Sequence, residues 1–368
     1  MRVALFCHSL LSDWNHGNAH FLRGVVTELA ARGHEVRAFE PASSWSAEHL
    51  VAEAGDAALA EAKRFYPAVA PTRYDLATLD LDLALAGVDL VIVHEWTDPE
   101  LARRIGAHRE RNATYRALFH DTHHRAVTDP RSLALCELGR YDGVLAFGRS
   151  LRDVYVKRGL AERVFVWHEA ADTRVFAPRG GSVERDLVWI GNHGDGERSA
   201  ELEELLVRPV RALGLTARVH GVRYPDEARV AFGRAGIELA GRIPNHLAPD
   251  AFARARATVH IPRRPYVESL PGIPTIRIFE ALACGVPLVV ARFRDDEGLF
   301  TPGLDFLSVE SGRDMTRALG SLLSSTERGR ALGEHGRATI LARHTCVHRV
   351  DELLAIHAGL EGPPVKNQ

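Results

Sequence analysis

Short apolar segments alternate with helical patterns along this chain, and they form two successive series. In the first series the segments expected to be strands are 3–7, 35–39, 90–94, 115–119, 143–147 and 164–167. In the second series they are 187–190, 216–219, 236–239, 258–261 and 288–291. Continuous apolar strands separated by helices are typical of parallel sheets covered on both faces. The pattern therefore predicts an α/β chain with two doubly wound, Rossmann-like domains.

The length of 368 residues exceeds what one hydrophobic core usually supports, which agrees with two domains. The segment 176–182 contains Pro178, Gly180 and Gly181 and is the natural linker between them. We expect the first domain over 1–178 and the second over 179–344. In doubly wound folds ligands bind beyond the carboxyl ends of the strands, so we expect the ligand there, between the two domains.

Composition excludes several classes of partner. The net charge of −2 gives no bulk attraction for nucleic acid or for an anionic membrane, so neither is expected as a partner. No run of 18 apolar residues occurs, so no transmembrane segment is predicted. The four cysteines are scattered and the N-terminus reads as a strand rather than a signal peptide, which predicts free thiols and a cytoplasmic location.

The segment 264–287 contains the most informative carboxylate. Breaks at Pro274 and before it precede a predicted helix over 275–284, which opens with Thr275 and Ile276 and carries Arg277 and Glu280 three residues apart. The free N–H groups at the helix start suit an anion, and Glu280 could accept hydrogen bonds from sugar hydroxyls. In the alternative, Arg277 and Glu280 only pair with each other on a solvated helix face.

Two loops of the first domain also follow predicted strands. In 8–24, Gly17 and Asn18 open a helix, where a glycine either lets a ligand approach the backbone or serves the turn's own geometry. In 118–130, His120 and Asp121 stand with two further histidines, but the spacing is not that of metal ligands on a helix. We therefore expect hydrogen bonding to a sugar or phosphate there, and no metal.

The loop 189–202 of the second domain has three glycines after a strand, with Asn192 between them and Arg198 before a helix. Such loops hold phosphates through backbone N–H groups, and an arginine adds charge-assisted contacts. The sequence Asp80-Leu81-Asp82 spells the metal motif of another class of sugar transferase, but it lies in a helical stretch where the carboxylates are expected to face solvent.

With these loops, the chain resembles the B-fold glycosyltransferases of the group-1 branch, which includes the spore-maturation glycosyltransferase-like proteins. The resemblance rests on SDWNHGNAHFLRG, ARGHEV, WIGNHGDGERSAEL, HEAADTRVFAP, PTIRIFEALACGVPLV and LARHTCVHRVDELL. It implies an acceptor-binding first domain, completed by a final helix within 345–368, and a second domain that binds a nucleotide sugar.

Residue roles follow from the resemblance. Glu280 is similar to the second glutamate of the family's E-x₇-E motif, which bonds ribose hydroxyls, and Arg198 to the residue that neutralises the donor diphosphate. Gly17 is similar to the glycine near the phosphate, and His120 to the histidine that contacts the transferred sugar. The first motif glutamate would fall at Gly272, with Glu268 the nearest acid upstream, so both stand as candidates for sugar contact.

These implications lead to an expected activity. We expect a metal-independent, retaining glycosyltransferase that moves a hexose from a nucleoside-diphosphate sugar to an acceptor hydroxyl on a glycan, a lipid-linked molecule or a small molecule, without a bound cofactor. Arg198 and Arg277 would stabilise the leaving diphosphate. A nucleotide-sugar epimerase on the same fold, and a catalytically inactive module that binds a nucleotide sugar, remain alternatives.

Overall fold

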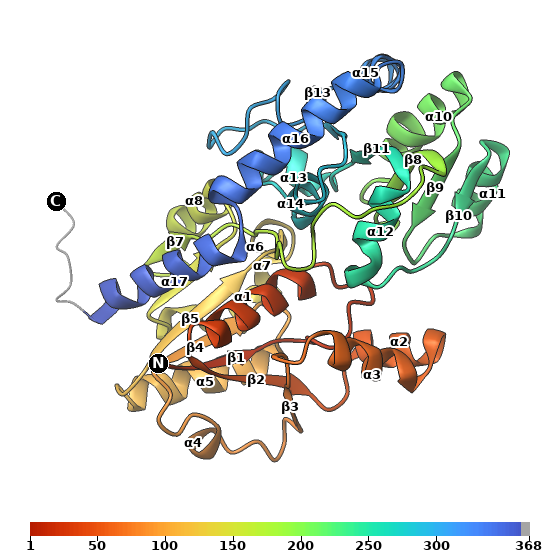
Figure 1. The fold of residues 1–368 in the computed structure, drawn as a ribbon. Helices are drawn as coiled ribbons and strands as arrows, with labels where there is room; N and C mark the ends of the chain where they lie inside the picture. The colour runs from red at the N-terminus through yellow and green to blue at the C-terminus, as the bar shows by residue number, and fades with distance from the viewer. Residues whose placement is uncertain (362–368) are drawn as a thin grey trace. The chain divides into compact units, whose positions relative to one another are not determined.

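A computed structural model describes residues 1–361, which form two parallel sheets of seven and six strands with helices on both faces (Figure 1). Two compact units result. The first contains Met1–Glu169 together with the chain from Cys346 onward, and the second contains Ala170–Thr345. The prediction of two doubly wound α/β domains is therefore confirmed. Residues 362–368, part of the segment predicted to complete the first domain, lie outside the described residues.

The first unit has its strands in the order β3-β2-β1-β4-β5-β6-β7, all parallel. The order reverses between β1 and β4, which makes the carboxyl ends of these two strands the switch point where such sheets bind ligands. The strands are β1 (Arg2–Phe6), β2 (Glu35–Pro41), β3 (Thr72–Tyr74), β4 (Leu90–His94), β5 (Arg116–Asp121), β6 (Gly143–Ala146) and β7 (Val164–Val166).

The helices of the first unit lie on both faces of this sheet, and the last of them, α17, lies alongside α1 (Figure 1). Arg32 at the end of α1 forms an ion pair with Asp351 of α17 at 2.5 Å. The helices are α1 (Ala19–Ala31), α2 (Trp45–Ala54), α3 (Asp56–Phe65), α4 (Leu81–Ala84), α5 (Pro99–Arg111), α6 (Arg125–Thr128), α7 (Pro130–Ala134), α8 (Arg149–Arg158) and α17 (Cys346–Glu361), with the 3-10 turn η1 (Leu138–Arg140).

The second unit repeats the arrangement with the order β10-β9-β8-β11-β12-β13 and a switch point between β8 and β11. Its strands are β8 (Arg185–Ile190), β9 (Ala217–His220), β10 (Ile237–Leu239), β11 (Ala255–His260), β12 (Leu288–Ala291) and β13 (Leu307–Val309). Its helices are α9 (Ser199–Leu202), the π-helical η2 (Glu203–Val207), α10 (Arg208–Leu213), α11 (Asp226–Arg234), η3 (Asn245–Leu247), α12 (Ala248–Ala253), α13 (Pro265–Glu268), α14 (Ile276–Ala283), α15 (Gly312–Leu323) and α16 (Thr326–Arg343).

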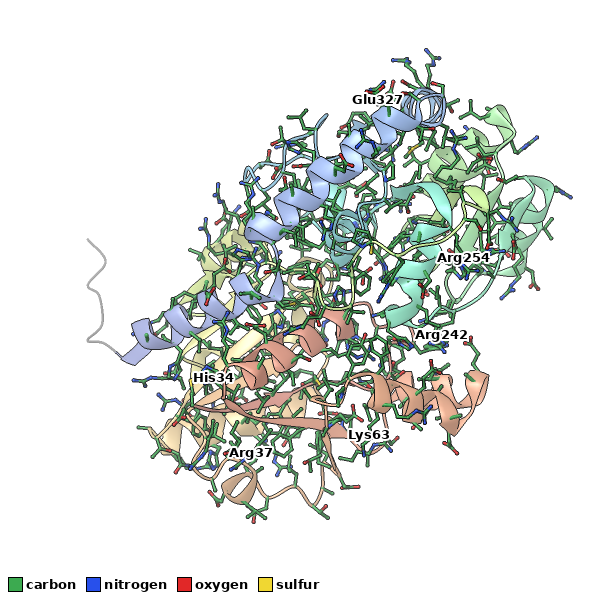
Figure 2. All side chains as sticks on the ribbon, in the orientation of Figure 1. His34, Arg37, Lys63, Arg242, Arg254 and Glu327 are labelled. Carbon is green, nitrogen blue, oxygen red and sulfur yellow. The ribbon has the colours of Figure 1, made fainter. Side chains whose placement is uncertain are left out.

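Apolar side chains fill the space between each sheet and its helices, while charged side chains such as Lys63, Arg254 and Glu327 point outward (Figure 2). Strand β4 is buried along its whole length, as its unbroken apolar sequence predicts. Two strands, β3 and β13, have no counterpart in the predicted set. Each has three residues and only one fully buried, so no apolar run marks it in the sequence.

The compact units divide nine residues before the boundary expected at 178, since the first unit ends at Glu169. The segment after Glu169 already belongs to the second unit, because Ala171 forms a parallel bridge with Thr345 and its N–H donates to the carbonyl of His344 at 3.1 Å. The chain therefore leaves and re-enters the first unit through two paired segments.

Candidate functional site

The loop after β1 is fixed in place by one buried arginine. Arg23 of α1 is 1% exposed, and its Nε and Nη2 donate to the carbonyls of Leu10 at 2.5 Å and Leu11 at 3.1 Å. Its Nη1 forms an ion pair with Asp13 at 3.3 Å. Because the guanidinium satisfies carbonyl groups that would otherwise be buried without partners, the loop is held against α1.

Gly17 and Asn18 complete this loop at the start of α1, as predicted. Gly17 is partly exposed, and its carbonyl accepts from the backbone N–H of His20 at 3.3 Å. The side-chain amide of Asn18 does not cap the helix but donates to Thr122 Oγ1, beyond the end of β5. The loops after β1 and β5 are thereby joined by a side-chain hydrogen bond.

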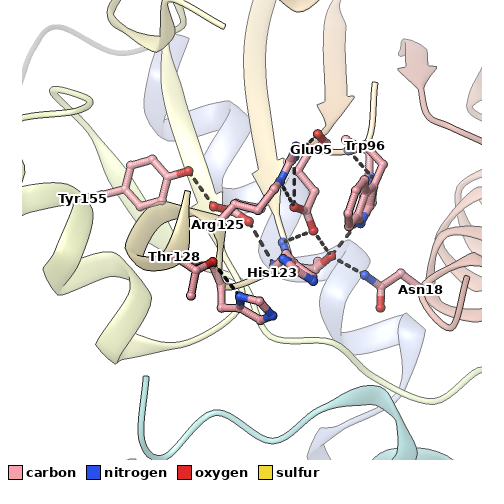
Figure 3. A network of polar contacts seen from close by, with 11 residues as sticks. Asn18, Glu95, Trp96, His123, Arg125, Thr128 and Tyr155 are labelled. Carbon is pink, nitrogen blue, oxygen red and sulfur yellow. Dashed lines mark hydrogen bonds and ion pairs between the residues drawn. The ribbon is translucent and has the colours of Figure 1, made fainter. Parts of the chain in front are cut away.

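A buried carboxylate, Glu95, lies at the centre of a polar network just beyond β4 (Figure 3). Its Oε1 accepts from Thr122 Oγ1 at 2.9 Å, and its Oε2 lies 3.2 Å from Arg125 Nη2. Burial raises the pKa of Glu95 to about 8; the nearby carboxyl of Asp121 raises it as well, and Arg125 opposes both. A perturbed carboxyl at a switch point fits a functional position, although Glu95 is only 1% exposed.

His120 and Asp121 lie within β5 rather than in the loop after it, which corrects the predicted strand 115–119. The strand is longer because His120 pairs with His94 of β4, and Asp121 with Ala146 of β6. Both side chains are fully buried. Asp121 accepts from the hydroxyl of Tyr155 at 2.6 Å, which links β5 to α8.

The ring of His120 packs edge-on against His94 and Trp167, with centroids 5.3 and 4.8 Å away. Neither ring nitrogen has a hydrogen-bond partner among residues 1–361, and burial lowers the pKa of His120 to about 3, so the ring is neutral. A neutral ring without access to solvent cannot touch a substrate unless its surroundings move. The predicted contact of His120 with a transferred sugar stays a prediction.

Arg198 lies at the switch point of the second sheet. Its Nη2 donates to the carbonyl of Asn192 at 2.6 Å, beyond β8, and its Nη1 donates to the carbonyl of Ile261 at 2.9 Å, beyond β11. Its guanidinium also lies over the ring of Trp189, 5.2 Å from the centroid. The side chain of Asn192 also helps to hold its loop in place, because its Oδ1 accepts from the N–H of Val222 at 3.0 Å. The predicted pair Asn192 and Arg198 is thus brought together.

Two further arginines surround Arg198. Gly194, with φ +83°, lies between Arg198 and Arg263, because a Cβ added there would be 3.1 Å from one Nε and 3.6 Å from the other. Desolvation, together with the charges of Arg263 and Arg277, lowers the pKa of Arg198 to about 10. We name Arg198, Arg263 and Arg277 the arginine cluster.

The three arginines of the cluster are not equally paired with carboxylates. Arg263 lies 3.2 Å from Glu197, and Arg277 forms an ion pair with Glu280. Arg198 has no ion pair with a carboxylate in the described part of the chain. Like charges held close together are stabilised when an anion binds between them, so the cluster is suited to a phosphate group.

The start of α14 has the geometry expected from the sequence. Thr275 precedes the helix in an extended conformation, no side chain caps the first turn, and the first turn contains no acidic residue. The first N–H groups of an eight-residue helix, which begins at Ile276 after the buried Pro274, are thus without a side-chain cap. Together with the dipole of α14 they favour a negative charge.

The pairing of Arg277 with Glu280 is present, but it is not on a solvated face. The Glu280 side chain is fully buried, whereas that of Arg277 is 25% exposed. Arg277 is therefore partly open to solvent, whereas the carboxylate it pairs with is not. A ribose could reach Glu280 only if this ion pair opened, and its predicted ribose contact stays a prediction.

Gly272 lies in a turn and Glu268 on the short helix α13, and their predicted contact with a sugar stays a prediction. Gly272 has φ +83°, a conformation that favours glycine, and a Cβ there would be 3.2 Å from the carbonyl of Arg294. Glu268 is exposed at the end of the short helix α13. The turn at Gly272 thus gives a conformational reason why no glutamate stands at this position.

No group of three or more His, Cys, Asp or Glu side chains within residues 1–361 is arranged to hold a metal ion. The Asp80-Leu81-Asp82 sequence behaves as expected. Asp80 caps α4 by accepting from the N–H of Leu83 at 3.1 Å, and Asp82 is 90% exposed and lies 3.0 Å from His108.

Sequence reasoning missed Arg263 and Arg125. Arg263 follows β11 by three residues, so a basic residue just beyond a buried strand next to the switch point could have indicated it. Glu95 directly follows β4, and with His94 and Trp96 it is the kind of strand-end residue that the sequence indicates as part of the wall beside the His120 loop. Arg125 carries no such signal, because its contact with Glu95 depends on the fold of the loop after β5.

Residues 198–355 match the family described as glycosyl transferase-like, a region that includes the whole arginine cluster and Glu280. No curated protein matches the sequence. No helix in the described part of the chain combines the length and apolar character needed to cross a membrane.

Solved structures share the fold over nearly the whole chain. Sucrose-phosphate synthase from Thermosynechococcus elongatus is 15% identical with a TM-score of 0.68, covering 98% of this chain and 99% of that protein. HepE from Anabaena, solved in complex with UDP, is 13% identical with a TM-score of 0.69, covering 98% and 100%. A DNA-modifying β-glucosyltransferase is 12% identical with a TM-score of 0.61, also covering 98% and 100%. The fold is therefore that of the B-type glycosyltransferases.

Proposed function

We propose that this chain is a group-1 glycosyltransferase, of the kind that includes the spore-maturation glycosyltransferase-like proteins, and that it uses a nucleoside-diphosphate sugar as donor. The observation that carries the proposal is Arg198, a cation at the switch point of the second sheet that donates to two carbonyls. The match of residues 198–355 to a glycosyl transferase-like family supports it. So does the shared fold of HepE, which was solved with UDP and with UDP-glucose.

The transferred group is proposed to be a hexose, and the reaction to retain its anomeric configuration. The bond from the anomeric carbon to the diphosphate oxygen breaks, and the bond to the acceptor oxygen forms. The diphosphate leaves with the electron pair and takes up the proton of the acceptor hydroxyl. The arginine cluster and the first N–H groups of α14 would stabilise the charge that develops on the diphosphate, which lowers the barrier.

Cations of the protein would do this without a metal ion, so the proposed reaction is metal-independent. The four cysteines are free and buried, which supports the expected cytoplasmic location. The proposed acceptor is an unidentified hydroxyl compound that binds the first unit.

Calorimetric titration with UDP, GDP, dTDP and ADP tests the donor site. For the nucleotide that binds, Arg198→Ala should weaken affinity by about 1.5 to 3 kcal/mol, which is roughly 10- to 150-fold in Kd. Arg198 also holds its own loop in place, so Arg198→Ala could weaken binding by disturbing the loop. Arg263→Ala therefore provides a second variant, at a residue that makes fewer hydrogen bonds to the backbone than Arg198 does. Arg330→Ala, which removes a 66%-exposed arginine of α16, is the matched control and should change nothing.

Turnover separates the proposal from its alternatives. Transfer to an acceptor, or slow hydrolysis of the donor sugar, supports the transferase. Interconversion of free nucleotide sugars would identify an epimerase. Binding without any turnover would identify an inactive module. NMR of the anomeric proton in the product tests retention.

A further inference from the structure

A cavity of about 410 Å³ opens in the first unit beyond the carboxyl ends of four neighbouring strands, β3, β2, β1 and β4. Its volume is within the range of small-molecule sites. Its lining does not include Glu95 or the predicted residues Gly17, Asn18, His120 and Asp121, but it adjoins the Glu95 network at Trp96. The lining residues are His8, Pro41, Ala42, Ser43, Ser44, Trp45, Tyr74, Asp75, Leu76, Trp96, Thr97 and Asp98.

Aromatic side chains form part of the wall. Trp45 is partly exposed and stacks on His8 with centroids 4.7 Å apart and ring planes 25° apart. Burial lowers the pKa of His8 to about 4, so its ring is neutral. Trp96 is also partly exposed, with the guanidinium of Arg125 over its ring. Indole rings present apolar faces to the C–H groups of a sugar ring and attract cations.

The charged groups of the wall are all acidic. Asp75 and Asp98 are exposed, and each uses Oδ1 to accept one backbone N–H, from Ala77 and Glu100 respectively, both at 2.8 Å. These contacts fix the two carboxylates in position. Neither a lysine nor an arginine is among the residues that line the cavity. The wall therefore repels anions and attracts cations.

We propose that this cavity binds the acceptor, and that the acceptor is a hydroxyl-rich ring that carries a protonated amine. This inference rests on the proposed function, which it deepens by naming the acceptor's chemical class. The ammonium group would bind Asp75 and Asp98, and the ring would pack on Trp45. An acceptor with a phosphate or carboxylate beside Asp75 and Asp98 would face two like charges, and the residues that line the cavity supply no cation to balance them.

Calorimetry on the full chain near neutral pH tests the ranking with three probes of the same ring size: glucosamine, glucose and glucuronic acid. We expect glucosamine to bind up to about fivefold more tightly than glucose, the scale of an ion pair with an exposed carboxylate. Glucuronic acid should bind less tightly than glucose. Asp75→Asn and Asp98→Asn together should remove most of the preference for the amine, since asparagine keeps the backbone hydrogen bonds. Asp153→Asn, an equal change of charge at an exposed site on α8, should leave the ranking unchanged.

Equal binding of the three probes, tighter binding of glucuronic acid, no binding of any probe, or an unchanged amine preference in the double variant would each overturn the inference. A titration with the nucleoside diphosphates in the same samples separates this inference from the proposed function. Nucleotide binding without the expected ranking refutes only the acceptor class. The expected ranking without any nucleotide binding refutes the donor function and leaves the cavity's chemistry standing.

Discussion

Replacing Glu280 with alanine should destabilise the second unit, whatever the ligand. The Glu280 carboxylate is fully buried against the guanidinium of Arg277, which is 25% exposed. Removing one partner of a buried ion pair typically costs 3 to 5 kcal/mol, because the other charge is left without compensation. The partial exposure of Arg277 lets water reach part of its charge, so we expect about 3 kcal/mol, the low end of that range.

Thermal unfolding, followed with and without a saturating nucleoside diphosphate, is the assay. For a unit of this size a loss of about 3 kcal/mol lowers Tm by roughly 6 to 12 °C. If Glu280 also accepts from both ribose hydroxyls when the ion pair opens, Glu280→Ala weakens the ribonucleotide by about 1.5 to 3 kcal/mol and the 2′-deoxynucleotide less. Glu280→Gln keeps the shape of the side chain and shows how much of either effect needs the charge.

The pair of Arg330 and Glu334 on α16 is the matched control. Their atoms lie 2.8 Å apart, as in an ordinary ion pair, but both side chains are about two-thirds exposed. Glu334→Ala should therefore cost only about 0 to 0.5 kcal/mol. Equal changes in Tm for Glu280→Ala and Glu334→Ala would refute the reasoning from burial. Equal loss of ribo- and deoxyribonucleotide affinity would remove Glu280 from recognition of the 2′-hydroxyl.

Three further predictions follow from the geometry. Gly272→Glu, which places a glutamate at the first position of the family motif, should lower stability by about 1 to 2 kcal/mol because φ is +83°, and an unchanged or raised Tm would contradict this. Acid should destabilise the first unit, because burial lowers the pKa of His16 and His120 to about 3. Below pH 6.5, the pKa of a histidine in the unfolded chain, the unfolded chain binds protons that the folded chain does not. Each of the two histidines therefore costs about 1.4 kcal/mol of stability per pH unit down to about pH 3. Glu95 has the opposite effect: its pKa in the folded chain is raised to about 8, so lowering the pH from about 8 to 4.5 stabilises the folded chain at this residue. Urea titrations between pH 6.5 and 4.5 should therefore show that His120→Leu loses less unfolding free energy per pH unit than the wild type. Equal losses in the two proteins would show that His120 does not contribute to the acid sensitivity. Turnover should survive exhaustive chelation, and its loss with EDTA followed by recovery with Mg²⁺ or Mn²⁺ would refute the metal-free reaction.

The doubly wound fold was predictable because its signal is local and repeated. The central strands β4 and β12 are mainly apolar runs, and both are buried along their whole length. The edge strands β3 and β13 were not predictable in this way. A strand at the edge of a sheet is covered on fewer sides, so its sequence needs fewer apolar residues.

The second-unit site was predictable in part because the carboxyl ends of parallel strands meet at one edge of a sheet. Asn192 and Arg198 follow β8, and the contact of Arg198 with the carbonyl of Ile261 joins this loop to the end of β11. Knowing the strands was enough to expect these loops to meet. Which arginine lies next to Arg198 was not predictable, because Arg263 and Arg264 follow the same strand and only their side-chain directions distinguish them. Arg264 pairs with the glutamate at position 201 on the surface, whereas Arg263 lies beside Gly194.

Glu280 shows why spacing cannot decide between a structural and a functional charge. The i, i+3 spacing correctly predicted that Arg277 and Glu280 would meet, and they do. The sequence left two alternatives open, a pair on a solvated helix face and a pair beside a ligand. In the structure the carboxylate is buried, while the guanidinium is partly exposed to solvent. Burial depends on what packs over the helix, and α14 packs against both α16 and the sheet, elements distant in sequence from one another. A buried carboxylate that is paired with a partly exposed cation is costly to maintain for stability alone. That cost is most simply explained if a bound nucleotide draws Arg277 toward its phosphates and releases Glu280 for the ribose, which the comparison of ribo- and deoxyribonucleotides measures directly.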